Sequence, residues 1–141
     1  MHSKLYLRVA ALITLLLAIG HTLGHPWLPV REDQGRAVVE AMSAYRFNVM
    51  GLSRSYRDFH LGFGWMLAAY LFGHAVLFWQ LAGLSLVPGT GTRPVVGVLL
   101  VEALIIAALA GEYLFWIPLA MSAAIAGCLA MALLANRAAA A

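Results

Sequence analysis

The chain is poor in charge and in cysteine. Nine basic and six acidic residues make only 11% of its 141 residues charged, whereas soluble domains carry about 25%. Cys128 is the single cysteine, which excludes an intramolecular disulfide and a zinc site built from several cysteines. The basic residues are scattered, so no basic patch predicts nucleic-acid binding. These shortages exclude a water-soluble enzyme, a nucleic-acid binder and a disordered tail.

Apolar residues are correspondingly abundant in this chain. They make up 63% of the chain, and the mean hydropathy is +0.87. The stretches 9–30, 59–92 and 113–136 contain no charged residue. A helix crosses a hydrocarbon core of about 30 Å with about 20 residues, and backbone groups in lipid must be hydrogen-bonded internally. The pattern therefore predicts an integral membrane protein made of helices rather than strands, in contact with a lipid bilayer.

Start and stop signals divide the apolar stretches into four helices. Pro26 stops the first helix, Ser55 and Asp58 have the spacing of a capping box before the second, and Pro94 and Pro118 suit the first turns of the others. The expected helices span residues 5–24, 59–83, 94–112 and 118–136. Short links make neighbouring helices antiparallel. We expect an all-α, antiparallel four-helix bundle that forms one transmembrane domain over residues 1–141.

The long loop, residues 26–57, holds eight of the fifteen charged residues. Within it Val38, Met42, Tyr45 and Val49 recur at helical spacing, which predicts an amphipathic helix lying on the membrane surface. Basic residues divide almost equally between the two faces of the bundle, and the first helix usually decides orientation. We expect a bacterial inner-membrane protein with cytoplasmic termini.

Polar residues gather at the face of the bundle that carries the long loop. They are His21, His25, Arg54, Arg57, Asp58, His60 and Glu112. Two interpretations of the acidic and basic members stay open. Asp58 and Glu112 are candidate acid-base catalysts, although Asp58 also suits a helix cap. Arg54 and Arg57 are candidate ligand-binding residues, although arginines here also suit anchoring to lipid phosphates.

The histidines of this face suggest a metal or a haem. His21 and His25 are one helical turn apart, so both imidazoles can reach one divalent metal ion, with His60 and Glu112 as further ligands. His21 and His60 on facing helices also have spacing that permits a b-type haem. The alternative is structural, with His21 bonded to a backbone carbonyl and His25 at the headgroups.

A deeper polar pair is expected near the bilayer midplane. Counted from the helix ends at about 1.5 Å per residue, His74 and Glu102 lie about 12 to 15 Å below the same face. Ionisable groups at this depth are costly and usually have a partner inside the bundle. We expect His74 and Glu102 to face inward and to touch. The pair either fixes helix register or takes part in acid-base catalysis.

The aromatic and small residues of the second helix are compatible with a ligand cavity. Trp65 is a candidate ligand-binding residue that lines either lipid or a cavity. Gly62, Gly64 and Gly73 allow close helix packing or leave room for a small hydrophobic ligand.

Two segments resemble a known family. Residues 20–25 read GHTLGH, and residues 50–64 read MGLSRSYRDFHLGFG. They are similar to the signature of a family of small bacterial four-helix membrane proteins that is named after a Leptospira locus and has no assigned function. In that family we expect tyrosine at the position that His60 occupies here. The resemblance implies the four-helix membrane fold and no particular reaction.

Three functions follow as expectations. The first is a multi-pass membrane protein whose polar site binds a small amphiphilic molecule, or transforms it by acid-base chemistry. The second is a redox or metal protein whose histidines ligate haem or a divalent ion. The third is an accessory subunit of a larger membrane complex, and assembly of identical copies also stays open.

Overall fold

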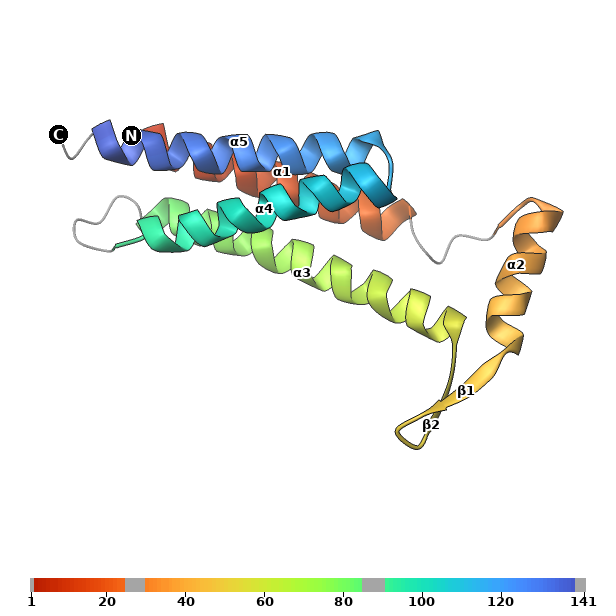
Figure 1. The fold of residues 1–141 in the computed structure, drawn as a ribbon. Helices are drawn as coiled ribbons and strands as arrows, with labels where there is room; N and C mark the ends of the chain where they lie inside the picture. The colour runs from red at the N-terminus through yellow and green to blue at the C-terminus, as the bar shows by residue number, and fades with distance from the viewer. Residues whose placement is uncertain (1, 25–29, 85–90, 139–141) are drawn as a thin grey trace. The chain divides into compact units, whose positions relative to one another are not determined.

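The computed structural model describes residues 2–24, 30–84 and 91–138. The elements, in chain order, are α1 (His2–Gly24), α2 (Asp33–Ala44), β1 (Arg46–Val49), β2 (Leu52–Ser55), α3 (Tyr56–Leu84), α4 (Arg93–Tyr113) and α5 (Trp116–Ala138) (Figure 1). The expectation of helices is confirmed for all four apolar segments, each of which extends beyond its expected bounds by one to three residues at one or both ends. Pro26, the expected stop of the first helix, lies outside the described residues.

Within the described residues, α1, α3, α4 and α5 are long and apolar enough to cross a membrane. α4 illustrates the pattern. Its buried residues, Val96, Leu99 and Ala103 among them, recur every three or four positions, while Val98 on the opposite side is 70% exposed. A helix that is apolar on every side suits a nonpolar solvent better than water. The composition of these helices is therefore compatible with a membrane protein.

The chain forms two compact units, Gly20–Tyr70 and the remainder, Met1–Ile19 with Leu71–Ala141. The unit made of Met1–Ile19 and Leu71–Ala141 is called the core unit here. It contains most of α1, the C-terminal half of α3, and α4 and α5. Leu7, Phe78, Leu99 and Leu129 come from these four helices and belong to one shared hydrophobic core. Alanines fill much of the space between the helices, which lets the backbones approach closely.

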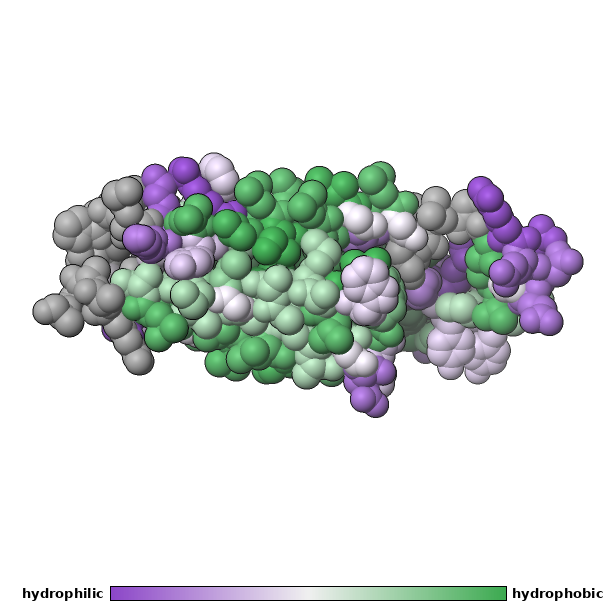
Figure 2. Space-filling view, turned by 90° about the horizontal axis from the view of Figure 1, so that it is seen from above, coloured by the Kyte–Doolittle hydropathy of each residue, from purple (hydrophilic) through white to green (hydrophobic). Residues whose placement is uncertain are grey.

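Apolar side chains also cover the outside of the core unit. Figure 2 shows them over α5 and the helices beside it almost without interruption. Leu16, Ile105 and Leu134 are each more than half exposed. Soluble monomers rarely expose a contiguous apolar area larger than a few hundred Å². The outer surface thus has the character of a lipid-facing surface.

The other unit, Gly20–Tyr70, is called the loop unit here, and its structure corrects one expectation. The long loop does contain a helix, α2, but this helix ends at Ala44, and Tyr45 is its C-cap. The expected amphipathic helix through Val49 is therefore wrong beyond residue 44. Arg46–Val49 and Leu52–Ser55 instead pair as a short antiparallel hairpin.

The hairpin has a two-residue turn at Met50 and Gly51. Both residues have positive φ, 51° and 86°, as in the tight turns that match the twist of a hairpin. The Gly51 N–H donates to Asn48 Oδ1 at 2.8 Å and closes the turn. The turn returns the chain directly to the start of α3, because Ser55 at the end of β2 precedes Tyr56.

Candidate functional site

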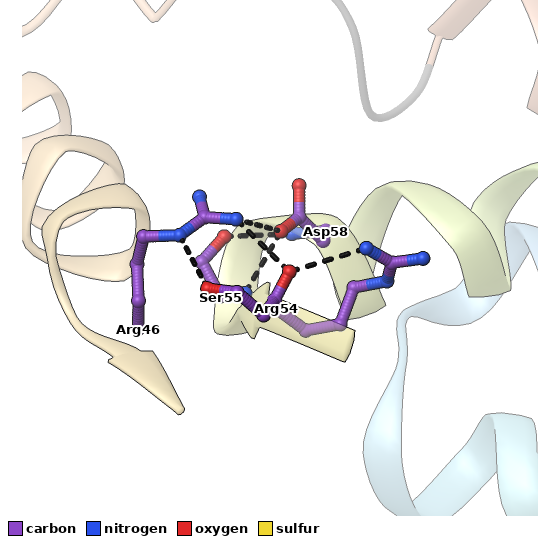
Figure 3. Close-up of polar contacts among 5 residues, drawn as sticks. Arg46, Arg54, Ser55 and Asp58 are labelled. Carbon is purple, nitrogen blue, oxygen red and sulfur yellow. Dashed lines mark hydrogen bonds and ion pairs between the residues drawn. The ribbon is translucent and has the colours of Figure 1, made fainter. Parts of the chain in front are cut away.

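The first turn of α3 is closed by a reciprocal capping box, as its sequence predicts. The Asp58 N–H donates to Ser55 Oγ at 3.2 Å, and the Ser55 N–H donates to Asp58 Oδ2 at 2.8 Å (Figure 3). Two N–H groups that the helix leaves without partners are thereby bonded. Ser55 is only 2% exposed, so the cap is a fixed point. Asp58 is held in place through one carboxylate oxygen.

Arg46 ties the hairpin together beside this cap. Its Nε donates to Ser53 Oγ and its Nη2 to the Ser53 carbonyl oxygen, both at 3.0 Å. The same Nη2 lies 3.9 Å from Asp58 Oδ2, at the outer limit of an ion pair (Figure 3). Both side chains of this pair are about half exposed, and such pairs contribute about 1 kcal/mol or less. Arg46 is mainly a hairpin brace.

Arg54 differs from Arg46 in having most of its guanidinium available. Its Nη1 donates to the Ser53 carbonyl oxygen at 3.1 Å. Among the described residues, no carboxylate lies close enough to form an ion pair with it. A guanidinium carries five N–H donors in a planar fork that matches phosphate and carboxylate. Arg54 can therefore bind an anion without giving up an internal ion pair.

An open groove of about 240 Å³ is lined by Arg54 and by residues of the first turns of α3. Its polar end is formed by Arg54 and Asp58, and its apolar wall by Phe59, Phe63 and Met66, with Gly62 between them. Phe59, Gly62, Phe63 and Met66 are spaced at i, i+3, i+4 and i+7, which places them on one stripe of the helix. A Cβ at Gly62 would meet no atom within 4 Å, so this glycine keeps the groove open.

Aromatic rings continue the apolar wall onto the hairpin. Phe63 contacts Phe59, Phe59 stacks on Phe47 with ring centroids 5.7 Å apart, and Phe47 packs against Tyr56 and Tyr45. Alternation along β1 puts Phe47 on the side of the sheet that faces these rings. Aromatic pairs of this kind contribute about 0.5–1.5 kcal/mol beyond their buried area. These aromatic contacts connect the hairpin to α3 and stabilise the groove.

His21 and His60 belong to the loop unit, but neither lines the groove. His21 Nε2 donates to the Gly64 carbonyl oxygen at 2.9 Å, the structural contact named as an alternative to metal binding. His60 is exposed on α3, and His25 lies outside the described residues. Within the described ranges, no three His, Cys, Asp or Glu side chains gather as metal ligands. A metal or a haem at these histidines stays a prediction.

The other predicted site residues are separate from the groove. Neither Arg57 nor Trp65 is among its lining residues, although both are on α3 beside residues that line it. Glu112 belongs to the core unit, where it is exposed near the end of α4.

The expected contact between His74 and Glu102 is present within the core unit. His74 Nε2 donates to Glu102 Oε2 at 3.2 Å, joining α3 to α4. The side chains are 28% and 42% exposed, so the pair lies at the edge of the core rather than fully inside it. His74 also contacts Phe78 edge-on, one turn further along α3. Counting helix residues predicted the contact correctly but overestimated its burial.

The sequence interpretation missed the apolar half of the groove and the brace. Phe59 and Met66 belong to a stripe that, in an apolar helix, is indistinguishable from a packing surface, whereas Gly62 is expected from the sequence to leave room for packing or for a ligand. From the sequence alone Arg46 is one of eight charged residues of the long loop, and its role depends on the hairpin. The signal that could have revealed the hairpin is the alternation of Tyr45, Phe47 and Val49 before the Met50–Gly51 turn.

No family model matches the chain, and comparisons with curated proteins and with solved structures give no match either. Membership of the Leptospira-named family therefore stays a prediction, and a function has to be argued from the geometry of the groove.

Proposed function

We propose that this chain is a multi-pass protein of the bacterial inner membrane that binds, at the membrane interface, a small amphiphile with a phosphate in its headgroup. Its four apolar helices cross the bilayer as an antiparallel bundle with cytoplasmic termini. The groove that joins Arg54 and Asp58 to an apolar wall is the observation that carries the proposal.

The length of α3 supports an interfacial position for this groove. Its 29 residues extend about 43 Å, whereas the hydrocarbon core is about 30 Å thick. Several residues must therefore lie among the headgroups. The end with Arg54, Arg57 and Asp58 is the charged one, and placing it in the headgroup region leaves Phe59, Phe63 and Met66 near the upper part of the acyl chains.

Charge complementarity supports a phosphate. The hairpin and the first turn of α3 contain one acidic residue, Asp58, and three arginines, Arg46, Arg54 and Arg57. Arg46 is engaged by the hairpin, whereas Arg54 has donors to spare. A volume of about 240 Å³ is smaller than the 300–1,000 Å³ typical of drug-sized ligands. The groove thus accommodates a headgroup and the first part of a chain, while the rest of the chain stays in the bilayer.

Substitution of Arg54 tests the proposal. Purified protein in detergent is titrated with a short-chain phosphatidylglycerol labelled on its acyl chain, and binding is followed by fluorescence anisotropy. Hydrogen bonds to charged groups contribute about 1.5–3 kcal/mol, so Arg54→Gln weakens binding about tenfold or more. The matched control is Arg36→Gln, which removes an exposed arginine on α2 that pairs with Asp33. Equal affinity of the two variants would refute the proposal.

A further inference from the structure

We infer that the groove selects a zwitterionic headgroup, in which a primary ammonium pairs with Asp58 while the phosphate pairs with Arg54. This inference rests on the proposed function and specifies its ligand as a phosphoethanolamine lipid. It starts from the fact that two opposite charges line one groove without forming an ion pair with each other among the described residues.

Asp58 keeps an unused acceptor. Both contacts of its carboxylate, with the Ser55 N–H at 2.8 Å and with Arg46 at 3.9 Å, go to Oδ2. Oδ1 has no hydrogen-bond partner among the described residues, and the side chain is 43% exposed. In Figure 3 this second oxygen points away from the dashed contacts. A carboxylate with one oxygen fixed and the other exposed is oriented to accept from a ligand N–H.

A phosphate without a positive group fits this groove poorly. An anion held by Arg54 shares the groove with the Asp58 carboxylate, and like charges at short range repel each other. A primary ammonium on the same headgroup turns that repulsion into attraction and supplies N–H donors for Oδ1. The Asp58 carboxylate thus weakens the binding of purely anionic headgroups and strengthens the binding of zwitterionic ones.

The apolar wall indicates a lipid rather than a free headgroup molecule. Phe63 is 63% exposed and Met66 is 51% exposed, and both line the groove directly beyond the charged end. Their exposed surface gives the first methylenes of an acyl chain an apolar contact. Free phosphoethanolamine lacks those methylenes, so it displaces the bound lipid only at much higher concentration.

The test uses two variants that separate the charge of Asp58 from its capping role. Asp58→Asn keeps a side-chain oxygen for the Ser55 N–H and removes the charge, whereas Ser55→Ala removes the hydroxyl cap and keeps the charge. Acyl-labelled phosphatidylethanolamine and phosphatidylglycerol of equal chain length are titrated against the full-length protein and both variants in detergent. We expect the unmodified protein and Ser55→Ala to bind the ethanolamine lipid about tenfold more tightly than the glycerol lipid. Asp58→Asn is expected to bind both lipids equally.

Each other outcome has a definite meaning. Equal binding of the two lipids by the unmodified protein, or tighter binding of the glycerol lipid, overturns the inference, while the loss of binding in Arg54→Gln still supports the proposed function. Loss of both lipids in Asp58→Asn, with its thermal unfolding unchanged, also overturns the inference, because it shows that the charge is needed for any lipid. Absence of binding to either lipid by the unmodified protein overturns the proposed function too.

Discussion

At the scale of single residues, the surroundings of a charge decide its role more than its type does. Arg46 and Arg54 lie on the two strands of one hairpin. Arg46 uses its guanidinium on Ser53 and approaches Asp58, so it braces the hairpin. Arg54 makes one bond to a carbonyl oxygen and lines the groove. Of these two arginines, only Arg54 is therefore proposed to bind the ligand.

The contact between His74 and Glu102 leads to a prediction about stability. Hydrogen bonds between membrane helices contribute about 0.6 kcal/mol on average and at most about 1.7 kcal/mol. His74→Ala and Glu102→Ala should each lower the free energy of unfolding in detergent, and the double variant should lose less than the sum by about this amount. Gln80→Ala combined with Glu102→Ala is the control, with additive losses. Additive losses for the His74 and Glu102 variants would mean that the two side chains do not interact.

At the scale of elements, α3 combines packing, capping and binding in one helix. Its first turn carries the capping box, the next turns carry the groove, and its C-terminal half belongs to the hydrophobic core through Phe78 and Leu81. Glycines 62 and 73 lie in different halves of this helix, and a Cβ at either would meet no atom within 4 Å. They form a matched pair for separating stability from binding.

Filling the groove should affect stability and binding in opposite directions. Glycine inside a helix costs about 0.5–1 kcal/mol relative to alanine, so Gly62→Leu and Gly73→Leu should both raise the unfolding temperature. Only Gly62→Leu places a side chain in the groove, and we expect it to weaken phospholipid binding about tenfold. Thermal unfolding and lipid titration of both variants measure the two effects. Unchanged lipid affinity in Gly62→Leu would place the binding site elsewhere.

Elements with strong local signals could be predicted from the sequence, whereas the local signals in the hairpin segment conflict. Runs without charge and the Ser55–Asp58 spacing located the helices and the cap, because these features follow from nearby residues alone. Val38, Met42, Tyr45 and Val49 fit helical spacing, yet the chain leaves the helix at Ala44. There the turn at Met50 and Gly51 and the aromatic contacts of Phe47 with α3 outweigh the local periodicity.

The site shows the same division between local and distant contacts. Arg54 and Asp58 stood out in the sequence because charges are rare in this chain, and both line the groove. Phe59 and Met66 did not stand out among so many apolar residues. The hydrogen bond from His21 to the Gly64 carbonyl oxygen joins residues 43 positions apart. The acceptor of that imidazole therefore depends on the fold and does not follow from neighbouring residues.

At the scale of the whole molecule, apolar surface is present in two different settings. The outer faces of α4 and α5 are apolar without nearby charge, as Val98 and Leu134 show, and they suit bulk lipid. The groove combines apolar surface with Arg54 and Asp58, and it suits one headgroup in a defined orientation. The proposed function therefore predicts that bulk lipid contacts the apolar outer faces, whereas one lipid is bound specifically in the groove.

Photo-crosslinking tests this central claim most directly. A phosphatidylethanolamine with a diazirine near the start of its acyl chain is added in trace amount to bilayers that contain the protein, and labelled residues are identified by mass spectrometry. We predict labelling concentrated on Phe59, Phe63 and Met66, and reduced there by Arg54→Gln. Labelling spread evenly over the exposed residues of α4 and α5, with none enriched along the groove and no effect of Arg54→Gln, would contradict the account.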